Sequence, residues 1–122
     1  MKLSPAGKEA KAYLEEADEA FTPSIVMAEL ARKYLREGVD ARIIGAWLQG
    51  ISEATEVYPI DIELSVVSAK AAVELMSKAR RERIERPGLG DALVLGTTRV
   101  VDGKVLTGDP HFKGLEETVW LE

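Results

Sequence analysis

The chain has 122 residues, and its 16 Lys and Arg against 21 Asp and Glu give a formal net charge of −5, which argues against a generic nucleic-acid coat. Apolar residues form 46% and charged residues 30% of the chain, so we expect residues 1–122 to form one globular domain rather than a disordered segment. The sequence has no cysteine for disulfides or thiolate zinc sites, and it has no apolar run near the ~20 residues of a membrane span, so we expect a cytoplasmic protein.

Hydrophobic spacing and turn residues predict helices that alternate with short strands. Ser4, Asp40 and Asp61 are expected helix N-caps, and Gly38 is an expected helix stop. In chain order we expect a helix over 5–18, a strand over 20–22, helices over 23–37 and 40–53, a strand over 55–59, helices over 61–81 and 91–100, and strands over 104–107 and 118–121. Strands separated by helices favour an α/β fold with a mostly parallel sheet.

The last two predicted helices carry distinctive apolar patterns. One side of the helix over 61–81 is apolar, and consists of Ile62, Val66, Ala69, Val73 and Met76. The helix over 91–100 is apolar on most of its circumference, which is typical of a buried helix. Asp91 is the only charge in its first two turns. A carboxylate there is stabilised by the helix N-terminus and could face a cleft, or it could serve simply as the N-cap.

Asp109 follows the predicted strand over 104–107. Ligands collect at the carboxyl ends of strands in open α/β sheets, so an acid at this position is well placed for a metal or a substrate. The alternative is that Asp109-Pro110 is only a turn. Thr107 would offer a hydroxyl on the same side of the strand as Asp109.

Glu29 is a third acid, although its helical position alone would not single it out. Lys33 lies four residues later, so an exposed Glu–Lys pair explains Glu29 equally well. Several acids that converge on one point bind Mg²⁺ or Mn²⁺, and such cations orient a water nucleophile and neutralise charge on a phosphodiester. This chemistry suits a chain with no cysteine, a single histidine and no Ser/His/Asp arrangement.

A basic cluster precedes Asp91 and consists of Lys78, Arg80, Arg81, Arg83 and Arg86. Arg80, Arg81 and Arg83 could contact RNA phosphates near a metal, or they could form a solvated helix end whose cations complement the helix dipole. His111 is a lone histidine in a predicted loop, and we expect it on the surface rather than in a site.

Three phrases occur in one order along the chain: 21–32 (FTPSIVMAELAR), 88–99 (GLGDALVLGTTR) and 104–115 (KVLTGDPHFKGL). They resemble the second-acid region, the third-acid helix and the closing Thr-x-Asp motif of PIN domains, and the resemblance runs from about residue 4 to the C-terminus.

The resemblance implies a PIN-like three-layer sandwich and a metal-dependent ribonuclease, most often the toxin of a VapBC-type toxin–antitoxin pair. Glu29, Asp91 and Asp109 would hold Mg²⁺ or Mn²⁺, and Thr107 would support them. The implied partners are an RNA substrate, a VapB-like antitoxin and a second copy of the chain.

The chain departs from the PIN pattern at its start. PIN domains begin with an apolar strand that ends in an Asp and lies in the middle of a sheet of order 3-2-1-4-5. Here residues 1–3 lead straight into Ser4-Pro5, so we expect a domain without its first strand and first acid. Loss of this strand would leave unpaired backbone groups on its two neighbours unless something else fills the gap. A misassigned start, a shortened chain or a strand supplied by a partner chain would each explain the absence, and we favour the first two.

The missing acid also leaves a second functional interpretation open. In that interpretation the chain is a catalytically inactive PIN-like module that dimerises or binds an antitoxin. An unrelated phosphoacceptor domain with an acidic Mg²⁺ pocket fits less well, because the chain lacks the late-strand Lys and early-strand Asp that such domains usually need.

Overall fold

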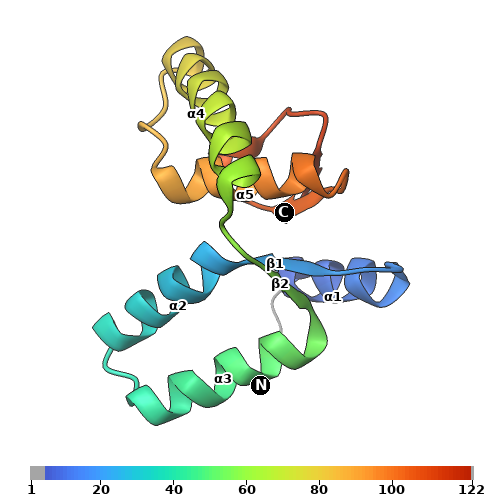
Figure 1. The fold of residues 1–122 in the computed structure, drawn as a ribbon, viewed down its shortest axis with the longest axis vertical. Coiled ribbons are helices and arrows are strands. Elements are labelled where there is room, and N and C mark those ends of the chain that lie inside the picture. Colours follow the sequence, from blue (N-terminus) through green and yellow to red (C-terminus); the bar gives the residue numbers. More distant parts are fainter. Residues whose placement is uncertain (1–4, 122) are drawn as a thin grey trace.

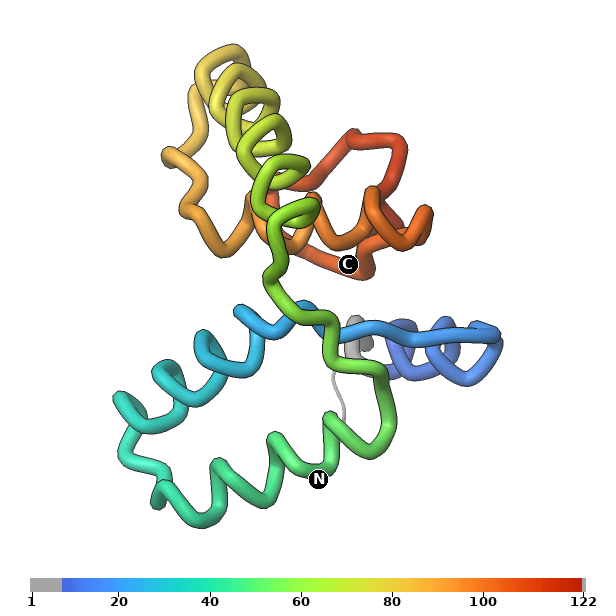
Figure 2. Tube along the Cα trace, in the orientation of Figure 1, coloured from blue at the N-terminus to red at the C-terminus, as the bar shows by residue number. Residues whose placement is uncertain are grey.

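The computed structural model describes residues 5–121, and it consists of helices and very short strands (Figure 1), whose path along the chain Figure 2 traces. The elements in chain order are α1 (Pro5–Glu16), β1 (Phe21–Pro23), α2 (Ser24–Arg36), α3 (Ala41–Ala54), β2 (Glu56–Tyr58), α4 (Ile62–Glu82), α5 (Leu89–Val100), β3 (Val105–Thr107), the 3-10 helix η1 (Pro110–Phe112) and β4 (Thr118–Trp120). Every predicted helix and strand is present in this helix-rich α/β fold. The expected Ser4 cap and residues 1–3 lie outside the described residues.

The strands form two parallel pairs. Pairing of β1 with β2 places Phe21 opposite Glu56, and pairing of β3 with β4 places Val105 opposite Thr118. The mostly parallel arrangement is therefore confirmed, but within residues 5–121 the two pairs stay separate sheets. In the expected order 3-2-1-4-5 these pairs correspond to 3-2 and 4-5, and no described strand lies between them.

Local sequence explains where the central helices begin. Asp40 accepts a hydrogen bond from the backbone N–H of Arg42 at 2.8 Å, and Asp61 accepts one from the backbone N–H of Leu64 at 2.8 Å. Both predicted N-caps are confirmed. Gly38, at φ +90, takes a left-handed conformation that suits glycine and ends the segment after α2.

The core lies between α4 and α5. Its buried residues come from these helices and from η1, and they are Ala71, Leu75, Ala92, Leu95 and Phe112. In Figure 1, α4 and α5 pack together with the C-terminal strands, while α2 and α3 run side by side in the other half of the molecule. The expected burial of the apolar helix is confirmed, since Leu93, Leu95 and Thr97 of α5 are all buried.

The apolar side that the sequence predicts for α4 is largely exposed. Ile62 is 85%, Val66 53% and Val73 68% exposed, whereas the buried side of α4 carries Leu64, Ser68, Ala71, Leu75 and Ala79. Ser68 lies directly against Gly96 of α5, so these two small residues let the helices approach closely, while Leu64 and Leu75 of the same side are fully buried. No helix within residues 5–121 is long and apolar enough to cross a membrane.

Candidate metal centre

Asp91 is held at the start of α5. The helix begins at Leu89 and its N-cap is Gly88, so the N-cap alternative for Asp91 is wrong. Asp91 instead occupies the third helical position, where its Oδ2 accepts a hydrogen bond from the backbone N–H of Gly88 at 3.1 Å. Its side chain is 26% exposed, so the carboxylate sits at the edge of the core with part of it open to a ligand.

Asp109 is oriented by the turn between β3 and η1. Its backbone N–H donates to Thr107 Oγ1 at 2.9 Å, and its own Oδ1 accepts from the backbone N–H of His111 at 2.9 Å. The turn at Asp109-Pro110 is therefore real, and the same turn presents the carboxylate. Thr107 acts on Asp109 through the main chain, so its hydroxyl supports the acid's position.

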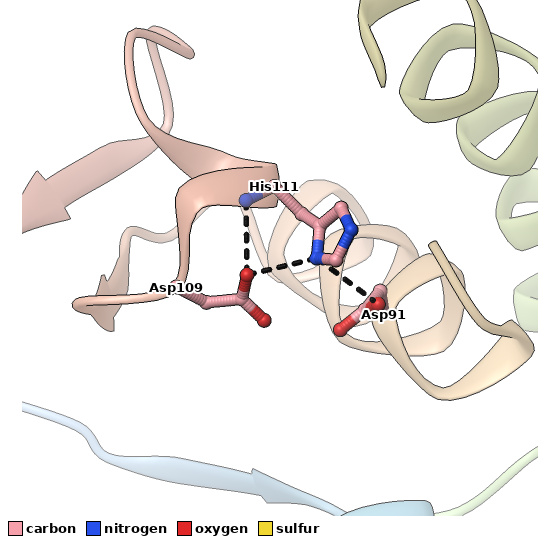
Figure 3. Close-up of side chains that lie close together, drawn as sticks. All are labelled: Asp91, Asp109 and His111. Carbon is pink, nitrogen blue, oxygen red and sulfur yellow. Dashed lines mark hydrogen bonds and ion pairs between the residues drawn. The ribbon is translucent and has the colours of Figure 1, made fainter. Parts of the chain in front are cut away.

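His111 joins the two acids, which sequence reasoning missed. Figure 3 shows its ring between Asp91 and Asp109, with Nδ1 2.8 Å from Asp109 Oδ1 and 3.7 Å from Asp91 Oδ2. Its Nε2 lies 2.7 Å from the carbonyl oxygen of Glu85, in the segment between α4 and α5. The available sequence signal was its place two residues after Asp109, since a one-turn helix folds that side chain back toward its cap residue.

The surroundings of His111 favour its protonated form. Burial lowers the pKa of the imidazole, but the hydrogen bond to the Glu85 carbonyl and the charges of Asp109 and Asp91 outweigh it, so the pKa lies above its usual 6.5. Both ring nitrogens face oxygen atoms, a carboxylate at Nδ1 and a carbonyl at Nε2, which favours a proton on each nitrogen while no cation is bound. Without another cation, the imidazolium supplies positive charge between the two carboxylates.

The donor set of this cluster fits a divalent cation. One ligand atom each from Asp91, Asp109 and His111 can be chosen so that all lie within 4.8 Å of one another. Carboxylate oxygens suit Mg²⁺ and Mn²⁺, and imidazole is a ligand that transition metals accept more readily than Mg²⁺ does. Asp109 and His111 are neighbours at the start of η1, whereas Asp91 comes from α5, so folding is what brings Asp91 to the other two.

Glu29 lies beside this cluster but outside it. Its side chain rests against Gly90, the residue before Asp91: a Cβ added at Gly90 would lie 2.8 Å from Glu29 Cδ and 2.9 Å from Oε1. The alternative of an exposed ion pair is not borne out, because no Glu29–Lys33 pair occurs in the described part of the chain. Glu29 thus approaches the start of α5 from α2, although it is not one of the three clustered ligands.

The basic cluster divides into one buried and several exposed side chains. Lys78 is only 6% exposed, and its Nζ pairs with Glu82 at 2.6 Å and donates to the Pro110 carbonyl at 3.2 Å. Lys78 therefore does not belong to the exposed part of the basic cluster that could meet RNA. Arg80, Arg81 and Arg83 are exposed at the end of α4 and remain available to a polyanion.

Comparison with known proteins adds one finding to this geometry. The family described as "PIN domain" matches residues 2–117, which is nearly the whole chain. The match includes α2 with Glu29, the start of α5 with Asp91, and the turn with Asp109 and His111. A search of curated proteins found no match.

Proposed function

The chain belongs to the PIN domain family, whose members are usually nucleases, and from this premise we propose that it is a metal-dependent endoribonuclease that hydrolyses RNA phosphodiester bonds in the cytoplasm. One observation carries the proposal. Two acids that are 18 residues apart in the sequence, Asp91 and Asp109, lie on either side of one imidazole nitrogen, in a cluster whose donors fit a divalent cation.

Each residue of the site has a separate role in this proposal. Asp91 and Asp109 would hold Mg²⁺ or Mn²⁺, and Glu29 would add negative charge from the neighbouring helix. Thr107 keeps Asp109 in position through the main-chain hydrogen bond. When bound, the cation supplies a water nucleophile at neutral pH and offsets charge on the scissile phosphate. No side-chain nucleophile is then needed.

Arg80, Arg81 and Arg83 are the proposed RNA-binding residues. They are exposed on the last turn and cap of α4, and the segment that follows them leads to Glu85, whose carbonyl contacts His111. Because these three arginines precede Glu85 by only two to five residues, they can bind phosphates that flank the scissile bond. Binding through such contacts weakens steeply as the salt concentration is raised. The slope of log K against log salt concentration should become shallower by about one unit for each phosphate contact that is removed.

We further propose that the chain is the toxin of a VapBC-type pair, with a VapB-like antitoxin and a second copy of itself as partners. The PIN family match supports this proposal, and oligomeric state by light scattering tests the second part. Co-purification with a small antitoxin encoded beside this chain would support the first part, and absence of any such neighbour would argue against it.

A second candidate is a catalytically inactive PIN-like module. The separate strand pairs favour it, because PIN domains place a central strand ending in an Asp between such pairs, and no described residue supplies that acid. The inactive module would bind a partner chain without cutting RNA.

Cleavage of RNA by the purified 122-residue chain separates the two candidates. We expect cleavage with added Mn²⁺, loss of cleavage in EDTA, and a drop of at least about 100-fold in Asp91→Asn and Asp109→Asn. Asp102→Asn is the matched control, because Asp102 is an exposed acid on the turn after α5 and lies outside the cluster. Undiminished cleavage in both site variants would refute the metal-dependent nuclease, and no cleavage by the folded parent chain would favour the inactive module.

A further inference from the structure

The ring of His111 is fixed by a group outside the acid pair. Its Nε2 lies 2.7 Å from the carbonyl oxygen of Glu85, and a carbonyl can only accept, so Nε2 carries a proton and donates it. This bond turns the Nδ1 edge of the ring toward Asp109 and Asp91 (Figure 3). A histidine that binds a metal through one nitrogen nearly always donates the other N–H to a carbonyl or a carboxylate in this way.

We propose that His111 Nδ1 is a third ligand of the cation held by Asp91 and Asp109, and that this nitrogen makes the site select Mn²⁺ or a similar transition metal over Mg²⁺. The inference rests on the proposed function, since it concerns the same cation. It adds a ligand and a metal preference that two carboxylates alone would not provide.

The donor distances agree with a shared cation. Neighbouring ligand atoms around a cation bound at about 2.1 Å lie roughly 3 Å apart in octahedral geometry. The Nδ1 distances to Asp109 and Asp91 are 2.8 Å and 3.7 Å, which bracket that value. The neutral ring, with its proton on Nε2, keeps the Glu85 hydrogen bond while its Nδ1 lone pair points to the acids. A cation at Nδ1 would take the place of the proton that joins this nitrogen to Asp109.

The metal preference follows from the nitrogen donor. Mg²⁺ strongly prefers oxygen ligands, whereas affinity for imidazole rises from Mn²⁺ through the later first-row metals. Losing the imidazole should thus cost Mn²⁺ more binding than Mg²⁺. The competing interpretation is a purely structural one, in which the Nδ1 proton orients Asp109 and the nitrogen never touches the cation.

Pulsed electron paramagnetic resonance of the Mn²⁺-loaded chain distinguishes these interpretations. His111 is the only histidine of the sequence, so a ¹⁴N coupling from a directly bound imidazole in tag-free protein can come from no other residue. We expect this coupling in the parent chain, its replacement by a ¹⁵N coupling after ¹⁵N-histidine labelling, and its loss in His111→Gln. The labelled parent chain answers the question even if the variant does not fold.

Affinity measurements by calorimetry provide a second readout. We expect His111→Gln to weaken Mn²⁺ binding about tenfold or more and Mg²⁺ binding clearly less, so the ratio of the two affinities falls. Glu85→Ala is the control, because it keeps the backbone carbonyl that holds the ring and should leave both affinities and the coupling unchanged. Mn²⁺ that binds through Asp91 and Asp109 without nitrogen coupling would overturn this inference and leave the proposed function standing. If the parent chain shows no Mn²⁺ binding that is lost in Asp91→Asn, both this inference and the proposed function are overturned.

Discussion

Lys78 Nζ donates a hydrogen bond to the carbonyl oxygen of Pro110 at 3.2 Å, and it thereby ties the turn that carries Asp109 and His111 to the long helix α4. The same nitrogen pairs with Glu82 at 2.6 Å, one helical turn further along α4. A buried ammonium needs such partners, because an unpaired charge at 6% exposure would be costly. The contact makes α4 a support for the candidate metal centre.

Replacing Lys78 with Met should loosen that turn while the helix stays folded. Met keeps the apolar stem of the side chain in its buried position but cannot donate to Pro110. We expect faster amide hydrogen exchange at Phe112, whose N–H bonds to the Asp109 carbonyl, and about tenfold weaker Mn²⁺ binding. Arg81→Met is the control on the exposed side of α4, and it should change neither measurement. Unchanged exchange in Lys78→Met would show that the tie is dispensable.

A methyl group at Gly90 should displace Glu29. The added Cβ would lie 2.8 Å from Glu29 Cδ, and the flexible carboxylate would have to swing away from the start of α5. If Glu29 contributes to cleavage, Gly90→Ala and Glu29→Gln should each slow it by a similar factor of about ten, and the double variant should be no slower than either. Gly88→Ala is the control, because nothing lies within 4 Å of a Cβ there. Multiplicative losses in the double variant would contradict this mechanism.

The contact between Gly96 and Ser68 should limit substitution in the core. A Cβ at Gly96 would lie 3.0 Å from both Cα and Cβ of Ser68, so Gly96→Ala should lower the free energy of unfolding by about 1–3 kcal/mol. Ser68 Oγ is buried and has no hydrogen-bond partner among the described residues, so Ser68→Ala should raise stability by about 1 kcal/mol.

Urea unfolding of both single variants and the double variant measures the coupling between these positions. The penalty of Gly96→Ala should shrink by at least about 0.5 kcal/mol in the Ser68→Ala background, because the hydroxyl is part of the obstruction. Gly45→Ala in α3 is the control, where open space surrounds the new methyl group and helix propensity should add up to about 1 kcal/mol. Strict additivity would argue against a direct clash.

The ion pair between Arg99 and Glu117 should make stability depend on acid pH. The hydrogen bond from Arg99 Nε at 2.6 Å holds the pKa of Glu117 below its ordinary 4.5, against the opposing effect of burial. A carboxyl whose folded pKa is depressed stabilises the fold above its unfolded pKa and loses that contribution as pH falls through the folded pKa.

Urea unfolding of the parent chain and Glu117→Gln tests this pH dependence. We expect the parent to be more stable by up to about 1 kcal/mol above pH 4.5, because the pair is partly exposed, and the difference should vanish at lower pH. Glu116→Gln, an exposed neighbour, should track the parent throughout. A difference that persists at low pH would assign the effect to packing rather than charge.

Local signals predicted much of this molecule correctly. Asp40 and Asp61 cap α3 and α4 because a carboxylate one to three residues before free N–H groups satisfies them without any distant partner. The burial of α5 and the parallel pairing of strands also follow from patterns within short windows. The order of the three phrases around Glu29, Asp91 and Asp109 identified the PIN family, which the match over residues 2–117 confirms.

Contacts between distant segments could not be read in the same way. The side of α4 containing Val66 and Val73 was the obvious candidate for the core, yet the buried side is the one with Leu64, Ser68 and Leu75, where Ser68 lies against Gly96 of α5. In the sequence, Lys78 is one of a run of basic residues. Only the folded structure shows that its buried ammonium donates a hydrogen bond to the Pro110 carbonyl.

By itself, the sequence predicted the elements, the caps of α3 and α4, the family and three acids worth testing, because each of these depends on residue types and their order along the chain. The tertiary structure alone decided that His111 completes the cluster and that Glu29 stays beside it. The ring of His111 is oriented by the carbonyl of Glu85, 26 residues earlier in the chain, and this contact exists only once α4 and α5 have packed. The spacing of residues in the sequence does not give their distance in the folded chain, and that distance is why a histidine expected on the surface is now the proposed third ligand of the metal.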